Sequence, residues 1–108
     1  MKRRHLEPEA SAEGALRGLC AALLAMRDAG EMRAFLNDLC TPAELESLAD
    51  RWSVVPRILE GMPYREIHEH TAVSITTIGR IARFLNNGAG GYRLAAERVP
   101  RTRAKARR

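Results

Sequence analysis

Residues 63–85 read PYREIHEHTAVSITTIGRIARFL, and this stretch decides the fold. Its pattern predicts two short helices, from about Tyr64 to His70 and from Ser74 to about Leu85, joined by a tight turn at residues 71–73. The apolar residues that would hold the two crossed helices together are Ile67, Val73, Ile78 and Ile81. This arrangement is typical of a helix-turn-helix, whose second helix lies in the major groove of DNA.

The second helix of this pair has a composition suited to DNA. It contains no acidic residue between Ser74 and Asn87, whereas an ordinary surface helix mixes charges of both signs. Ser74 is placed to cap the helix and leave amides near a phosphate, and residues of the first turn reach base edges. Two arginines three residues apart share one face, where each meets a guanine or a phosphate, unless both are only solvated. The predicted DNA-binding residues are Arg65, Ser74, Thr76, Thr77, Arg80 and Arg83.

Two positions depart from the usual helix-turn-helix pattern, and a third residue is unusual inside a helix. The middle of the turn normally has a positive φ, which favours glycine, but Ala72 stands there. His68 occupies a place where a small residue is usual. Gly79 lies inside the second helix, which suggests that another backbone, a ligand or DNA comes close to it. The departures at Ala72 and His68, together with the negative charge of the body of the chain, keep open an alternative function, a helical protein-interaction module without sequence-specific DNA binding.

The rest of the chain also predicts helices. Apolar residues recur at helical spacing over about residues 12–28, with Gly30 as the expected cap, and again over residues 31–39. Thr41-Pro42-Ala43-Glu44 is a helix start, with a capping residue, a proline in the first turn and a glutamate that completes a capping box. The helix that follows contains Pro56, which either bends it or divides it in two. A last short helix is expected from about Tyr92 to Val99, so the chain is predicted to be all-α with about six helices.

Charge divides the chain into a body and two basic ends. The formal net charge is +5, but residues 5–97 hold all thirteen acidic side chains and nine basic ones, a formal charge of −4. The basic ends would attract phosphate without reading sequence, or would be solvated tails. We therefore predict a flexible N-terminal arm over residues 1–12, a helix-turn-helix domain over 13–99 and a basic disordered tail over 100–108.

Other classes of protein find little support in the sequence. The longest apolar stretch, residues 16–26, is too short and too interrupted to span a membrane, so a cytoplasmic protein is expected. Cys20 and Cys40 lack metal-ligand spacing, and His68 and His70 point to different faces of a helix, so no metal is expected. The sequence contains no nucleophile–base pair and no phosphate-binding loop, so we do not expect an enzyme.

The chain resembles the Trp repressor family over about residues 30–97. The stretches that carry the resemblance are FLNDLCTPAELESLADRW (35–52), ILEGMPYREIHEHTAVSITTIGRIARFLNNG (58–88) and GGYRLA (90–95). The resemblance implies an all-α, intertwined homodimer that binds double-stranded operator DNA and regulates transcription, most often as a repressor. It also implies that the N-terminal helices of each subunit cover the core of the other.

The same resemblance implies a small-molecule corepressor site. Thr41, Arg51 and Arg80 stand where the founding repressor holds tryptophan, and they are the candidate ligand-binding residues. A glycine and a serine of the founding repressor are replaced here by Ile81 and Phe84, which would fill the space of the indole and its ammonium group. We therefore expect that tryptophan does not bind, and that the pocket is empty, filled by its own side chains or suited to another ligand.

Overall fold

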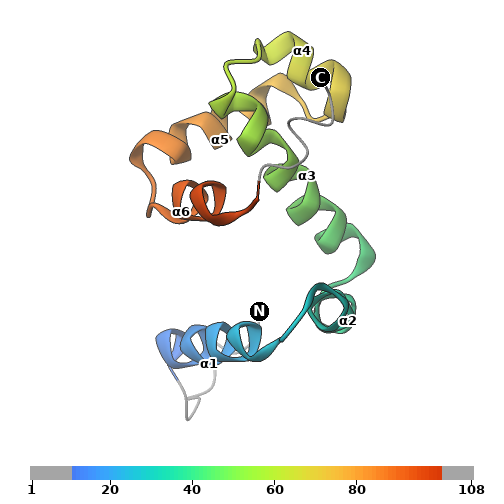
Figure 1. Cartoon of the computed structure of the whole chain (residues 1–108), viewed down its shortest axis with the longest axis vertical. Helices are drawn as coiled ribbons and strands as arrows, with labels where there is room; N and C mark the ends of the chain where they lie inside the picture. Colours follow the sequence, from blue (N-terminus) through green and yellow to red (C-terminus); the bar gives the residue numbers. More distant parts are fainter. Residues whose placement is uncertain (1–10, 101–108) are drawn as a thin grey trace. The chain divides into compact units, whose positions relative to one another are not determined.

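A computed structural model describes residues 11–100, and all its regular structure is helical. The six helices are α1 (Ala12–Ala25), α2 (Ala29–Leu39), α3 (Pro42–Leu59), α4 (Tyr64–Thr71), α5 (Ile75–Asn87) and α6 (Gly91–Arg98) (Figure 1). This confirms the prediction of an all-α fold with about six helices. Of the predicted arm, residues 1–10 lie outside the described residues, whereas Ser11 caps α1 and Ala12 begins it. Of the predicted tail, residues 101–108 also lie outside the described residues.

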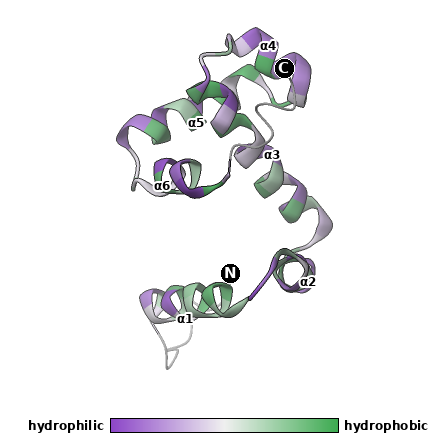
Figure 2. Ribbon diagram, in the orientation of Figure 1, coloured by the Kyte–Doolittle hydropathy of each residue, from purple (hydrophilic) through white to green (hydrophobic). Residues whose placement is uncertain are grey.

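The chain forms two compact units, of which the first ends at Pro42 and the second begins at Ala43. The first unit contains α1 and α2, and none of its described residues is buried. Much of α1 is nevertheless hydrophobic (Figure 2). Leu16 and Leu24 on α1 are 55% and 85% exposed, and Leu39 on α2 is 50% exposed. The two helices of this unit therefore carry apolar side chains that it does not bury.

The junction between α1 and α2 differs from the prediction. The first helix ends at Ala25 rather than near Asp28, and Gly30 lies inside α2 instead of capping α1. Asp28 is the N-cap of α2, because its Oδ1 accepts a hydrogen bond of 2.8 Å from the amide of Glu31. The carboxylate of Glu31 in turn accepts a 2.8 Å hydrogen bond from the amide of Arg27. These two hydrogen bonds cap the start of α2 just ahead of Gly30, so the glycine lies inside the new helix and not at the end of the old one.

α3 is one helix, although Pro56 lies inside it, so the structure selects one of the two alternatives left by the sequence. The Arg57 side chain donates a hydrogen bond of 2.9 Å to the carbonyl oxygen of Ser53, one turn earlier. After Pro56 the helical hydrogen bonding continues to the end of α3, where the Glu60 amide donates a hydrogen bond of 3.0 Å to the Pro56 carbonyl oxygen. The chain then turns at Gly61, whose φ of 86° suits glycine.

The described core lies entirely in the second unit. Val54 and Val55 of α3 are fully buried, as are Ile67 of α4 and Ile78 of α5. The other buried side chains are Val73 in the turn and Ile81 and Leu85 on α5. Half-buried side chains pack around this cluster, among them Trp52, Ile58, Met62, Tyr92 and Ala96. All four apolar residues that the sequence predicted to join the two crossed helices are buried.

The turn between α4 and α5 is held by side chains that bond to its own backbone. Ala72 has φ of 66°, which confirms the left-handed conformation expected at the centre of the turn. The Thr71 hydroxyl donates to the Ile67 carbonyl oxygen (2.7 Å) and accepts from the Val73 amide (3.1 Å). His68 Nδ1 lies 2.8 Å from the Val73 carbonyl oxygen. His68 thus has a structural role that compensates for its unusual position in the motif.

α6 is fastened to the end of α5 by Arg93. The Nε of Arg93 donates to the Leu85 carbonyl oxygen at 3.1 Å, and its Nη2 donates to Asn86 Oδ1 at 3.2 Å. Tyr92 and Ala96 of α6 also pack on the core. Because the last carbonyl groups of a helix lack partners within it, this arginine stabilises the end of α5 as well as the contact with α6.

We predict that Ala72→Gly raises the free energy of unfolding by about 0.5–1 kcal/mol. Glycine removes the strain of an L-residue at positive φ, and the greater freedom of the unfolded chain offsets part of that gain. Ala49→Gly, in the exposed interior of α3, is the matched control and should lower stability by about 1 kcal/mol. Urea denaturation at one protein concentration measures both, and an equal loss for the two variants would contradict the strained turn.

We predict that Arg93→Ala lowers the free energy of unfolding by about 1–2 kcal/mol, because two hydrogen bonds at the end of α5 are lost. Arg98→Ala, at the end of α6, the helix that also contains Arg93, is the matched control and should change the free energy of unfolding by less than about 0.5 kcal/mol. Amide hydrogen exchange gives a second measurement, since the last turn of α5 should exchange faster in Arg93→Ala alone. Unchanged exchange there would show that Arg93 does not fasten the two helices.

Candidate nucleic-acid interface

α5 presents a sharply divided surface. Ile78, Ile81 and Leu85 face the core, at the i, i+3 and i+7 positions of a helix. The opposite stripe, at the same spacing, consists of Thr76, Gly79, Arg80, Arg83 and Asn87. The stripe therefore includes three of the predicted DNA-binding residues, and Thr76, Arg80 and Arg83 are all exposed.

The start of α5 is built around Ser74. Its Oγ accepts a hydrogen bond of 3.1 Å from the Thr77 amide and donates one of 3.0 Å to Thr77 Oγ1. Ser74 is thus the N-cap that the sequence predicted, and Thr77 is half-buried beside it. The amides of Ile75 and Thr76 have no acceptor within the helix, so they are available to an anion. The Thr77 hydroxyl already serves the cap, which favours Thr76 over Thr77 as the side chain that meets bases.

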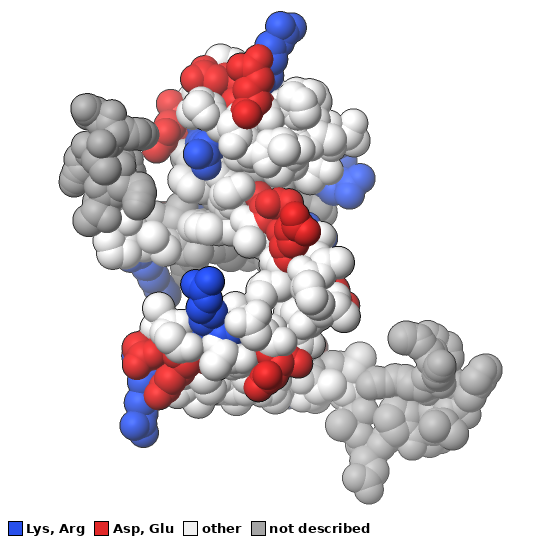
Figure 3. Space-filling view, turned by 90° about the vertical axis from the view of Figure 1, so that its right-hand side faces the viewer, with Lys and Arg blue, Asp and Glu red and all other residues white. Residues whose placement is uncertain are grey.

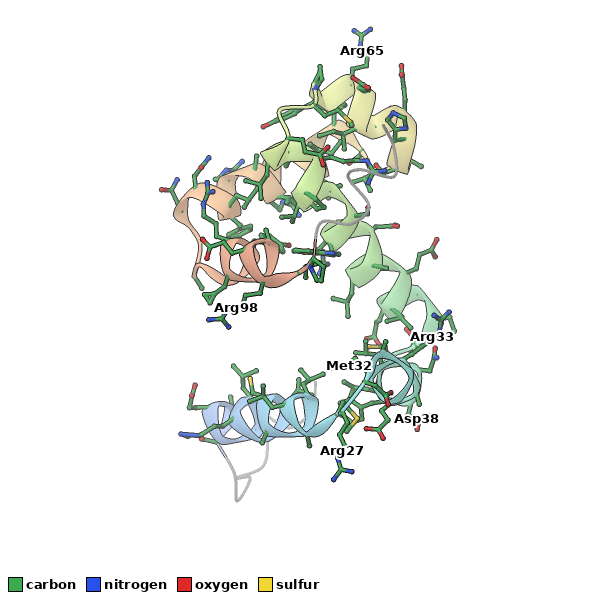
Figure 4. The ribbon with its side chains drawn as sticks, viewed as in Figure 1. Arg27, Met32, Arg33, Asp38, Arg65 and Arg98 are labelled. Carbon is green, nitrogen blue, oxygen red and sulfur yellow. The ribbon has the colours of Figure 1, made fainter. Side chains whose placement is uncertain are left out.

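The predicted phosphate- and base-contacting arginines are all exposed. Arg80 and Arg83 lie on α5, and Arg65 extends outward from α4 (Figure 4). Among the described residues, an ion pair within 4.0 Å joins His70 Nε2 to Glu66 Oε2 at 3.7 Å, and none of these three arginines takes part in it. Acidic side chains occur on both units (Figure 3), but α5 has none. The exposed face of α5 therefore carries two arginines and no acidic side chain of the helix itself.

Two residues on or beside this face were not among the predicted site residues. Ile75, the first residue of α5, is 46% exposed, so an apolar side chain stands at the end of the helix where base contacts begin. Asn87 continues the exposed stripe by one more turn. The helical repeat counted from Thr76 would have found Asn87, whereas the exposure of Ile75 depends on how the core closes.

The candidate ligand-binding residues are spread over both units. Thr41 belongs to the first unit, while Arg51 on α3 and Arg80 on α5 belong to the second, and both arginines are exposed. Of the two residues expected to fill the space of an indole, Ile81 is buried in the core and Phe84 is 53% exposed. A ligand at Thr41, Arg51 and Arg80 stays a prediction. Within residues 11–100, His, Cys, Asp and Glu form no group of three that could hold a metal ion, and none of the helices is long and apolar enough to cross a membrane.

Comparisons with known proteins agree with this geometry. A family model described as "Trp repressor protein" matches residues 14–99. The protein named "Uncharacterized protein YerC" from Bacillus subtilis (strain 168) is 40% identical over 81 residues, which is 75% of this chain and 78% of that protein. The crystal structure of a TrpR like protein from Eubacterium eligens ATCC 27750 superposes with a TM-score of 0.74 at 38% identity, over 78% of this chain and 87% of the other.

The match with the family model includes residues of both units, and the solved structure has a similar fold over 78% of this chain. The helix-turn-helix that the sequence predicted at residues 64–85 is formed by α4 and α5. The chain belongs to the Trp repressor family, a family of helix-turn-helix DNA-binding regulators.

Proposed function

We propose that this protein is a sequence-specific transcriptional regulator, a repressor that binds double-stranded DNA as a homodimer. The observation that carries the proposal is the exposed, acid-free stripe of α5. The opposite face of the helix is buried in the core through Ile78, Ile81 and Leu85. A stripe of this kind fits the major groove, where side chains meet base edges and phosphates together. The proposal includes a cytoplasmic location, which binding to chromosomal DNA supports.

The site residues divide into two roles. Thr76, Arg80 and Arg83 lie on the stripe and would meet or flank base edges, with Thr77 beside them at the cap. Arg65 on α4 and the free amides after Ser74 would hold phosphates on either side of the groove. Phosphate contacts fix the position of α5, and base contacts then supply the preference for one sequence.

The homodimer is proposed from the first unit. Its two helices expose large apolar side chains, including Leu16 and Leu24, and bury none of their described residues. The first unit by itself leaves this surface in water, and we propose that a second copy of the chain covers it. A two-fold dimer also places two recognition helices against successive major grooves of one DNA face, about 34 Å apart.

The decisive experiment measures binding of the full chain to the DNA upstream of its own gene and to an unrelated duplex across a salt series. A sequence-reading regulator prefers its own DNA, and the preference persists at moderate salt. Equal binding to both duplexes would leave only phosphate contact. Binding to neither, with and without a panel of amino acids and aromatic metabolites, would favour the alternative, a helical protein-interaction module.

We predict that Arg83→Ala weakens binding to the preferred duplex by about 1–3 kcal/mol, with a smaller effect on the unrelated duplex, because a base contact is lost. Arg33→Ala removes the same charge from α2, outside the helix-turn-helix (Figure 4), and is the matched control. Fluorescence anisotropy with both duplexes gives the affinities. A loss of equal size for the two variants would remove Arg83 from the reading surface.

We predict that Leu16→Asp shifts the protein from dimer to monomer. Leu16 shares a helical face with Leu19, Cys20 and Leu23, so a carboxylate there would be buried without a partner in the dimer. Ala21→Asp adds the same charge to the exposed opposite side of α1 and should leave the dimer intact. Sedimentation equilibrium measures the mass of each variant, and a dimeric Leu16→Asp would move the interface away from this face.

A further inference from the structure

Gly79 lies in the middle of α5, on the exposed stripe between Thr76 and Arg83. Apart from its chain neighbours and the backbone of its own helix, a Cβ added to Gly79 would meet no atom of residues 11–100 within 4 Å. Its backbone has ordinary helical geometry, so the conformation does not require glycine either. Nothing within the described chain therefore explains why this helix position lacks a side chain.

Three other glycines of the second unit, Gly61, Gly88 and Gly90, have reasons within the fold. Gly61 and Gly90 have φ of 86° and 93°, which L side chains rarely adopt. A Cβ on Gly88 would collide with the backbone of Phe84 at the end of α5. Gly79 meets neither condition, and glycine inside a helix is less stable than alanine. The glycine at position 79 thus lowers the stability of α5, and no contact within the described chain compensates for this loss.

We propose that Gly79 is the point where α5 approaches DNA most closely, and that the group it admits is the 5-methyl of a thymine. This inference rests on the proposed function, because it requires α5 in the major groove. Without a side chain at the centre of the stripe, the helix lies closer to the base edges, so Thr76 and Arg83, on either side, reach them.

The space left by the missing side chain of Gly79 suits the thymine methyl group better than a polar group of a base. The Cα of Gly79 offers no hydrogen-bonding group, and the exposed Thr76, one turn earlier on the same stripe, carries a methyl of its own. A small apolar spot of this kind suits the thymine 5-methyl, the one apolar group that base pairs present in the major groove. The arginines beside the spot, Arg80 and Arg83, supply the polar contacts to neighbouring bases or phosphates.

The test is Gly79→Ala in the full chain, measured for both stability and DNA binding. Stability should increase, with a melting temperature higher by about 4 °C, because alanine favours the helix and its Cβ meets open space. Affinity for the preferred duplex should fall roughly tenfold, since the added methyl group displaces α5 from the bases. Affinity for an unrelated duplex should stay the same, because long-range attraction to phosphate groups tolerates a small displacement of α5.

Gly18→Ala is the matched control. Gly18 is another glycine inside a helix, and an added Cβ there would also meet no atom within 4 Å beyond its chain neighbours and the backbone of its own helix. It is exposed, whereas Gly79 is half-buried, and it lies on α1 away from the apolar face of that helix. It should raise the melting temperature by a similar amount and leave affinity for both duplexes unchanged. If Gly79→Ala lowered the melting temperature or dissociated the dimer, the glycine would have a packing role and the inference would be overturned.

A second arm identifies the thymine. Each thymine of the preferred duplex is replaced in turn by uracil, which removes only the 5-methyl group. At one position in each half-site the wild-type affinity should fall roughly fourfold, the value of one buried methyl group. On that duplex Gly79→Ala should bind about as well as the wild type, because the space for its Cβ is now open.

The outcomes separate this inference from the function on which it rests. If the wild type prefers its own DNA and Gly79→Ala keeps the full preference, the regulator stands and the role of Gly79 is wrong. A tenfold loss that no uracil position relieves would also overturn the thymine contact. If the wild type shows no preferred duplex with any probe tested, the proposed function fails first.

Discussion

The packing of α4 across α5 is the contact on which the rest of the structure depends. Ile67 and Ile78 are fully buried there, against Val54 and Val55 of α3, and no other described part of the chain contains a buried cluster. Seven buried side chains make a small core, so the loss of any one is a large fraction of the stability. The core therefore needs a turn that fixes both helices at one angle, and the hydrogen bonds of Thr71 and His68 supply it.

The same core determines what α5 can offer to a ligand. Because Ile78, Ile81 and Leu85 are fixed inside, the helix cannot rotate, and the opposite stripe points outward in one defined orientation. Ser74 sets the first residue of the helix, and Arg93 holds its last turn through Leu85 and Asn86. A helix secured at both ends and along one side presents a rigid surface, which lowers the entropy lost on binding.

Much of this arrangement was predictable from the sequence, because it depends on short-range patterns. Helical spacing located the two crossed helices, and the positive φ of Ala72 followed from the requirements of the turn. The predicted junction of α1 and α2 was wrong, because a helix-starting and a helix-ending signal lie within three residues of each other. The capping by Asp28 and Glu31 is stronger than the tendency of Gly30 to end a helix. The open space around Gly79 could not be predicted, because spacing along a helix does not show which neighbouring segments come near.

The two units of the chain meet opposite physical requirements. The second unit buries a cluster of its own, whereas α1 and α2 are shaped by their caps and leave their apolar side chains in water. Helices of 14 and 11 residues are marginal by themselves, so the stability of the first unit depends on what covers it. If a second copy is that cover, folding of α1 and α2 is linked to association, and dilution lowers both. DNA that holds two copies side by side would then stabilise the first unit without contacting it. Each copy bound at one half-site raises the local concentration that the other copy experiences, and this favours association.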